Sequence, residues 1–170
     1  IQKAEERVRT AVHALGLRNT TVHAELMKID DEWKIIEIGP RMGAFRHTLH
    51  KLSCDIDHAL NDVLTRIPKK VCIPKKCKGY AATLRYYPDH EGDILEMKGV
   101  KTVQKLKSFE SISVNSKIGD RVRFSKNGGK AVLSLNLYNK SRSDLLADIR
   151  RAEQKISVTV AQSGRVKRNK

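Results

Sequence analysis

The chain has 170 residues and a formal net charge of +15 at pH 7, with a sequence pI near 9.9. This length suffices for one domain or two small ones with a buried core. No apolar run approaches the roughly 20 residues of a membrane-spanning helix and no signal peptide is visible, so we expect a cytoplasmic protein with no membrane partner. Three cysteines are too few for a disulfide framework, and reduced thiols are the expectation.

The first third of the chain predicts a helix, a hairpin and two further helices. Apolar residues recur at helical spacing in three segments. Two short strand-like segments joined by an acidic turn lie between the first and the second of these helical segments. The expected elements are a helix over 2–15 ended by Gly16, a hairpin over 21–39, a short helix over 47–52, and a helix from the N-cap Asp55 to Ile67 ended by Pro68.

From Gly79 onward the pattern changes to short strands separated by turns. The expected elements are strands over 79–87, 93–97, 112–114 and 121–125, a short helix within 99–107, a hairpin turn at Asn127-Gly128-Gly129 leading into a strand over 131–138, a helix capped by Ser141 and Asp144, and an edge strand over 156–160.

The hairpin brings two carboxylates opposite each other. A turn at Asp30-Asp31-Glu32 predicts the cross-strand pairs Glu25 with Glu37, Met27 with Ile35, and Ile29 with Trp33. Period-two alternation then predicts one face with His23, Glu25, Met27, Ile29, Trp33, Ile35, Glu37 and Gly39, and another with Ala24, Leu26, Ile36 and Ile38. Because both faces are mostly apolar, we expect a central hairpin covered on each side.

Opposed like charges repel, so the Glu25 and Glu37 pair needs an explanation. A cation can neutralise it, one carboxyl can stay protonated, or both can act on a substrate. Magnesium is commonly held by one or two carboxylates plus nucleotide phosphates, and Arg41 adds a fixed fork for phosphate or carboxylate. The alternative is that both glutamates extend into solvent at the strand ends. The pairing depends on the inferred register, and a slip of one residue would move all side chains of one strand to the other face.

The basic charge suggests a second function. It is concentrated at residues 69–78, 98–107 and 164–170, which have the character of a linker, a surface segment and a tail. Aromatics are few and no RNA-recognition, KH or zinc-finger pattern is present, so nucleic acid is not the favoured partner. The alternative function is a basic, non-catalytic module that binds nucleic acid or an acidic partner. Glycoside hydrolysis by the carboxylate pair is a third hypothesis, with no sugar cleft to support it.

Two segments carry a family resemblance: HAEL at 23–26 and IIEIGPRMG at 35–43. They strongly resemble the metal-binding region of the ATP-grasp superfamily of carboxylate-amine ligases, and its branch acting on amino acids and small peptides looks most similar. Gly39 stands where many members carry a metal-binding asparagine. The roles implied by the resemblance are metal binding by Glu25 and Glu37, nucleotide binding by Met27 and Glu37, catalysis by Arg41, and substrate binding by His23, Arg41 and Gly43.

The resemblance extends over nearly all of residues 2–160 and implies an α+β fold. Residues 1–68 would form the C-terminal half of an ATP-grasp catalytic domain, an antiparallel sheet with packed helices. Residues 69–78 would be a basic linker or loop, 79–160 a small strand-rich α+β subdomain, and 161–170 a disordered basic tail.

The activity implied by the resemblance is ATP-dependent ligation through an acyl phosphate. ATP, Mg²⁺ (or Mn²⁺) and small carboxylate and amine substrates, amino acids among them, would be the ligands. The lid strands and phosphate-binding lysine of the family are absent from the sequence. We therefore expect a processed chain or a piece of a longer protein, inactive alone and completed by the missing N-terminal half.

Overall fold

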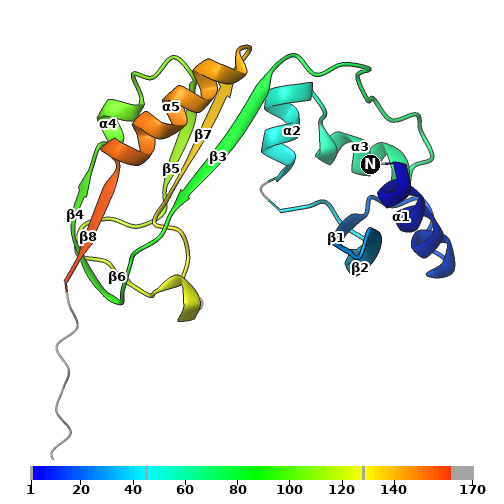
Figure 1. Cartoon of the computed structure of the whole chain (residues 1–170), viewed down its shortest axis with the longest axis horizontal. Coiled ribbons are helices and arrows are strands. Elements are labelled where there is room, and N and C mark those ends of the chain that lie inside the picture. Colours follow the sequence, from blue (N-terminus) through cyan, green and yellow to red (C-terminus); the bar gives the residue numbers. More distant parts are fainter. Residues whose placement is uncertain (1, 45, 128, 162–170) are drawn as a thin grey trace, which may run out of the picture. The chain divides into compact units, whose positions relative to one another are not determined.

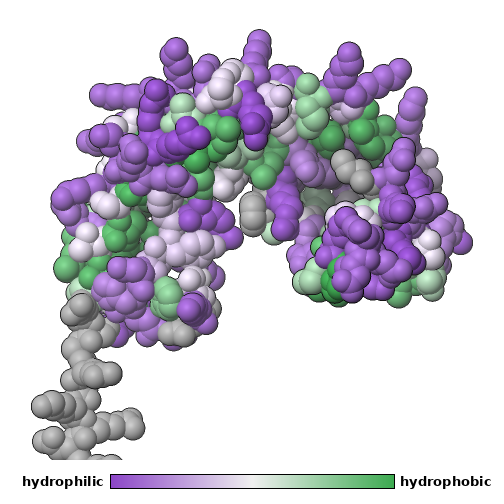
Figure 2. Space-filling model, viewed as in Figure 1, coloured by the Kyte–Doolittle hydropathy of each residue, from purple (hydrophilic) through white to green (hydrophobic). Residues whose placement is uncertain are grey.

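The computed structural model describes residues 2–44, 46–127 and 129–161 (Figure 1). All but the first residue of the tail expected at 161–170 lies outside this range. The chain divides into two compact units, residues 1–77 and 78–170. Hydrophilic side chains cover most of the visible surface of both units, and hydrophobic surface emerges in smaller areas (Figure 2). Within the described residues no helix is long and apolar enough to span a membrane.

The first unit contains the helices and the hairpin expected from the sequence. Its elements are α1 (Gln2–Ala14), β1 (His23–Ile29), β2 (Glu32–Gly39), α2 (Arg46–Cys54) and α3 (His58–Arg66). The N-cap of α3 is Asp57 rather than the predicted Asp55. Asp57 has extended backbone and its carboxylate accepts a hydrogen bond from the Leu60 N–H at 3.0 Å, whereas Asp55 has a left-handed φ of 57°.

The hairpin register differs from the prediction at its tip. Asp30 and Asp31 have φ values of 48° and 60°, as in a two-residue type I′ turn. Residues 26–29 of β1 are consequently displaced by one residue relative to the predicted partners, so the expected Met27–Ile35 and Ile29–Trp33 pairs are wrong. A register shift after Glu25 leaves Ile36 as the extra residue of β2, and beyond this bulge Glu25 lies opposite Glu37 as predicted.

The bulge determines which side chains share a face with the glutamates. Met27 pairs with Lys34, while Trp33 and Ile35 pair with Lys28 and Leu26 and so belong to the other face. Trp33 and Ile35 are half-buried, and α1 packs against β2. Met27, by contrast, is 50% exposed. The prediction of a hairpin covered on both sides is therefore wrong: the glutamate face is open.

The second unit is rich in short strands. The elements of this unit are β3 (Tyr80–Tyr86), β4 (Gly92–Lys98), α4 (Val100–Val103), β5 (Phe109–Val114), β6 (Arg121–Val122), the 3₁₀ turn η1 (Ser125–Asn127), β7 (Leu133–Asn139), α5 (Arg142–Lys155) and β8 (Ser157–Val160). The strands form two antiparallel three-stranded sheets, β3-β7-β5 and β6-β4-β8. Helix α5 packs against β3 and β7 (Figure 1).

The hydrophobic core lies in this second unit. Alternate residues of β7 point into it, where they meet one face of α5 and short α4. Ser141 caps α5 by accepting a hydrogen bond from the Asp144 N–H at 3.3 Å, as the sequence predicts. The main cluster consists of Val103, Leu133, Leu135, Leu137, Leu145, Ala152 and Ile156, and a smaller one of Ile94, Val122, Val132 and Val160.

The predicted Asn127-Gly128-Gly129 hairpin is wrong. Strand β6 pairs with β4, whereas β7 pairs with β3 and β5, so the segments that the turn was expected to join belong to different sheets. Gly128 itself lies outside the described residues. A turn signal shows where the chain reverses but not which strand it pairs with next.

The expectation of three reduced cysteines is also wrong. Cys54, the last residue of α2, forms a disulfide with Cys77, and Cys72 is free and exposed. Between them, the backbone of Cys72 is held by Asn61 of α3, which donates to the Cys72 carbonyl and accepts from its N–H, both at 2.9 Å. The basic segment after α3 is thus attached to the first unit.

Candidate functional site

The site begins with the opposed carboxylates. Glu25 of β1 and Glu37 of β2 are cross-strand partners, and both are exposed on the open face of the hairpin. Directly opposed residues have Cβ atoms roughly 4.5 to 5.5 Å apart. Two oxygen-rich side chains at this separation and facing solvent are suited to a hard divalent cation, whose remaining ligands can be water.

Arg41 lies directly beside this pair. Its Nη2 is 3.7 Å from the Glu37 Oε1, and its Nη1 donates to the Met42 carbonyl at 3.0 Å. Both members of the ion pair are more than half exposed, so the attraction contributes little to stability. The guanidinium therefore remains available to a phosphate or carboxylate bound against the glutamates.

A third protein ligand is not in place. No group of three or more His, Cys, Asp or Glu side chains that could hold a metal ion occurs among the described residues. Gly39, two residues after Glu37 on β2, supplies no side chain. A Cβ built there would lie 3.5 Å from the Arg41 Nε, which is ordinary van der Waals contact. The position could thus accommodate a larger residue.

His23 and Gly43 are brought into contact with each other. A Cβ on Gly43 would lie 2.7 Å from the Cδ2 of His23, so glycine allows this close approach and any other residue would force the imidazole or the loop to shift. The Arg46 Nη1 is 3.0 Å from the His23 Nε2. Because arginine only donates, this nitrogen accepts and the ring proton is on Nδ1. Nδ1 is buried and has no hydrogen-bond partner among the described residues.

A small cavity of about 100 Å³ extends behind this contact. The His50 Nδ1 and His58 Nε2 are 2.6 Å apart. Burial lowers the pKa of His58, and the neighbouring His50 and His47 lower it further by repulsion. His47 and His50 are three residues apart in the sequence, a spacing that places two side chains on one face of a helix, whereas no pattern in the sequence distinguishes His58. The lining residues are Thr21, Val22, His23, Gly43, Arg46, His47, His50 and His58.

Met27 lies on the glutamate face with Lys34 opposite it. Its large exposed fraction leaves an apolar surface beside charged groups. Lys34 is ion-paired with Glu32. The sequence predicted Ile35 opposite Met27, but the bulge at Ile36 shifts the register so that Lys34 lies there.

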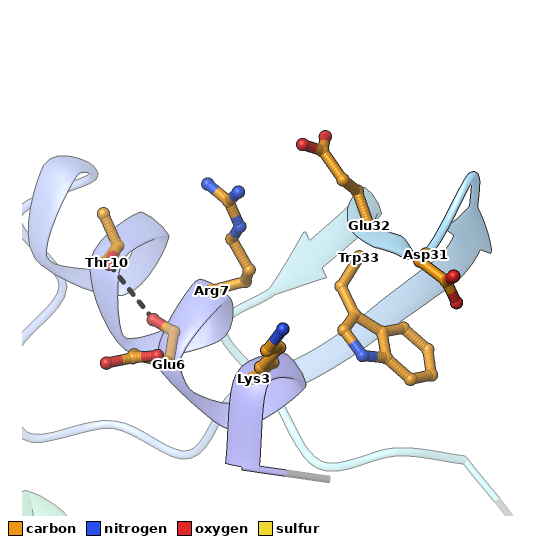
Figure 3. Close-up of a pocket in the computed structure, with 7 residues that line it drawn as sticks. All are labelled: Lys3, Glu6, Arg7, Thr10, Asp31, Glu32 and Trp33. Atoms are coloured by element: carbon orange, nitrogen blue, oxygen red, sulfur yellow. Dashed lines mark hydrogen bonds between the residues drawn. The ribbon is translucent and has the colours of Figure 1, made fainter.

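A larger depression, of about 450 Å³, lies between α1 and the hairpin tip (Figure 3). Trp33 and Glu32 point to opposite sides of the hairpin there. A hydrogen bond from Lys34, its charge and that of Arg7 lower the pKa of Glu32. None of the predicted site residues line this depression, which consists of Lys3, Glu6, Arg7, Thr10, Asp31, Glu32 and Trp33.

No protein-family model and no curated protein sequence matches the chain. Solved structures do. L-amino acid ligase from Bacillus licheniformis superposes with a TM-score of 0.79 at 16% identity, over 94% of this chain and 41% of that one. Phosphoribosylglycinamide synthetase from Anaerococcus prevotii gives 0.73 at 16% identity, over 94% and 42% of the two chains.

A third similar structure, N5-carboxyaminoimidazole ribonucleotide synthetase from Thermotoga maritima, gives a TM-score of 0.65 at 14% identity over 92% of this chain. The chain spans only about two fifths of the length of these three proteins. At such identities the similarity is one of fold. The chain therefore has part of the fold of the ATP-grasp carboxylate-amine ligases.

Proposed function

We propose that this chain supplies the metal and phosphate clamp of an ATP-dependent carboxylate-amine ligase. The observation that carries the proposal is the open hairpin face on which Glu25 lies opposite Glu37 with Arg41 at 3.7 Å from Glu37. The fold similarity to ligases supports the same class. The whole reaction would need the parts of the fold that this chain does not contain.

The clamp residues fit Mg²⁺ or Mn²⁺ chemically. Glu25 and Glu37 are hard oxygen donors in contact with solvent, and two carboxylates plus phosphate oxygens and water make up a common magnesium shell. The bound cation would offset the charge of the ATP phosphates. Without a third protein ligand, binding by the chain alone is expected to be weak and to strengthen when nucleotide contributes oxygens.

The remaining residues would position substrates. Met27 would pack against adenine, and Arg41 would stabilise the charge on the phosphoryl group as a substrate carboxylate oxygen attacks the γ-phosphorus and ADP leaves. An amine would then displace phosphate from the acyl phosphate. Gly43 and His23 would contact the acid or the amine. The similarity to an amino acid ligase favours amino acids as substrates.

The proposal is tested with protein expressed from the complete reading frame. ADP release should require Mg²⁺, an acid and an amine together, and a new amide should appear in equal amount by mass spectrometry. ATP hydrolysis that is indifferent to the amine would contradict ligation. The 170-residue chain alone should not turn over ATP. Turnover by this chain would contradict the proposal that the reaction needs further parts of the fold.

Gly39→Asn should strengthen divalent-metal binding by about tenfold, because it adds an amide oxygen two residues from Glu37, at a position where a Cβ makes only ordinary van der Waals contact with the Arg41 side chain. Mn²⁺ binding to the 170-residue chain, followed by electron paramagnetic resonance, measures this directly. Gly39→Ala is the matched control, since it adds the Cβ without the oxygen and should leave affinity unchanged. Equal affinity in the asparagine and alanine variants would place the metal elsewhere.

A further inference from the structure

We propose that the second unit has a phosphate-binding site of its own, formed by β6 and the loop that precedes β7, for a small ligand carrying two or more phosphate groups. The site is a depression of about 320 Å³, at the lower end of the range of small-ligand sites. Three of its lining residues are cationic and none is acidic. The lining residues are Ser116, Arg121, Val122, Arg123, Gly129 and Lys130.

Two arginines flank the buried residue of β6. Val122, the last residue of β6, is buried in the smaller core cluster. Arg121 precedes it in the strand and Arg123 directly follows the strand, and both are exposed and line the depression. Two guanidinium forks two residues apart can contact separate phosphate groups of one ligand.

Gly129 brings Lys130 beside these arginines. A Cβ on Gly129 would lie 1.9 Å from the Arg123 carbonyl oxygen, so the loop packs backbone against backbone and only glycine fits. The Gly129 N–H donates to the Phe124 carbonyl at 3.0 Å, which fixes the loop to the segment that follows β6. The third cation is therefore held at the site by backbone contacts.

The positive charge of this site is only slightly offset. Asp93 of β4 is 3.6 Å from Arg121, and both side chains are more than half exposed. Arg123 and Lys130 form no ion pair or side-chain hydrogen bond with another of the described residues. An anion bound between them would relieve their mutual repulsion, and the Ser116 hydroxyl could donate to it.

The lining favours a small ligand over a nucleic acid strand. Single-stranded nucleic acids are bound by cationic grooves that also present aromatic rings for base stacking. None of the residues that line this depression is aromatic. The nearby Phe124 ring lies under Lys126, whose Nζ is 6.0 Å from the ring centroid. The chemistry present is thus that of phosphate contact alone.

The test uses the ¹⁵N-labelled 170-residue chain without divalent metal, which removes any contribution from the hairpin clamp. Tripolyphosphate is titrated at low salt against sodium chloride of equal ionic strength, and amide shifts are followed by NMR. We expect saturable shifts at Ser116, Arg121, Arg123 and Lys130. Shifts that are absent, that rise linearly, or that centre on the hairpin instead would overturn the proposal.

Charge-removing variants separate a site from general electrostatic attraction. Arg123→Gln and Lys130→Gln should each weaken tripolyphosphate binding at least fivefold. Lys126→Gln, which removes one charge from the same loop but does not line the depression, should change it less than twofold. Equal weakening in all three variants would overturn the proposal. An RNA 12-mer is the second probe. The proposal would also be overturned if this RNA bound 100-fold more tightly than tripolyphosphate and if its affinity fell equally in all three variants, because the surface would then be a nucleic acid site.

Discussion

Replacing Glu37 by Gln should reduce ligation by the complete protein at least 100-fold while leaving its folding stability almost unchanged. Replacing residues that only orient metal ligands typically lowers metal affinity or activity 10- to 100-fold, so replacing a direct ligand should lower activity further. The side chain is exposed, and its distant pairing with Arg41 is worth little. Removing one of two opposed carboxylates also relieves their repulsion.

Two measurements on the 170-residue chain accompany the activity assay. Mn²⁺ binding should be lost in Glu37→Gln, and the free energy of unfolding should change by less than about 0.5 kcal/mol, as for most surface substitutions. Glu32→Gln is the matched control, because it removes a glutamate of the same strand whose partner is Lys34 at the hairpin tip. If Glu37→Gln retained normal Mn²⁺ affinity, the clamp assignment would fail.

Asp148→Ala should destabilise the second unit by about 2 to 4 kcal/mol. Asp148 is 2% exposed, accepts a hydrogen bond from the Ser108 N–H at 3.0 Å, and is ion-paired with Arg151 at 2.6 Å. Truncation leaves the Ser108 N–H buried without a partner. Asp148→Asn, which keeps an acceptor oxygen, should cost less, and Asp144→Ala on the exposed side of α5 should cost under about 1 kcal/mol.

Urea unfolding followed by tyrosine signals and amide exchange in the second unit measures this loss. Trp33, the only tryptophan of the chain, belongs to the first unit, so its fluorescence transition should stay in place. A shift of the Trp33 transition as large as that of the second unit would show that the two units unfold together and would contradict the local explanation.

The lowered pKa of Asp148 makes the free energy of unfolding depend on pH. Burial raises the pKa of this carboxyl, but hydrogen bonds from Ser108 and Arg151 and the charge of Arg151 outweigh it, so the pKa lies below its usual 3.8. A carboxyl with a lowered folded-state pKa stabilises above its unfolded-state pKa, and this contribution is lost as the pH falls through the folded-state value. The stability difference between wild type and Asp148→Asn should therefore narrow below about pH 4.

The sequence predicted the type and order of most elements, because they follow from local signals. Helical spacing gives α1 and α5, and Ser141 three residues before Asp144 gives the start of α5. The pairing of strands is not local. The Asn127-Gly128-Gly129 turn looks like a hairpin, yet β6 and β7 enter different sheets because each finds its hydrogen-bond partners elsewhere along the chain. The Cys54 to Cys77 disulfide, too, depends on where α2 ends in space.

The glutamate pair was predicted correctly through two deviations that cancel. Two consecutive aspartates in left-handed conformation make the turn one residue shorter than expected, a conformation more typical of Asn-Gly or Asp-Gly. The bulge at Ile36 then restores the original register. Side chains between turn and bulge, Trp33 and Ile35 among them, were consequently assigned to the wrong face, whereas Glu25 and Glu37 were assigned to the right one.

The bulge at Ile36 also separates the register at the glutamate pair from the length of the turn. In a regular ladder, gaining or losing one residue at a turn would shift every pair along both strands and separate the two glutamates. Here an irregular position already lies between turn and carboxylates, and a change in turn length can be absorbed there. A change in the length or charge of the tip can therefore leave the alignment of the carboxylate pair intact.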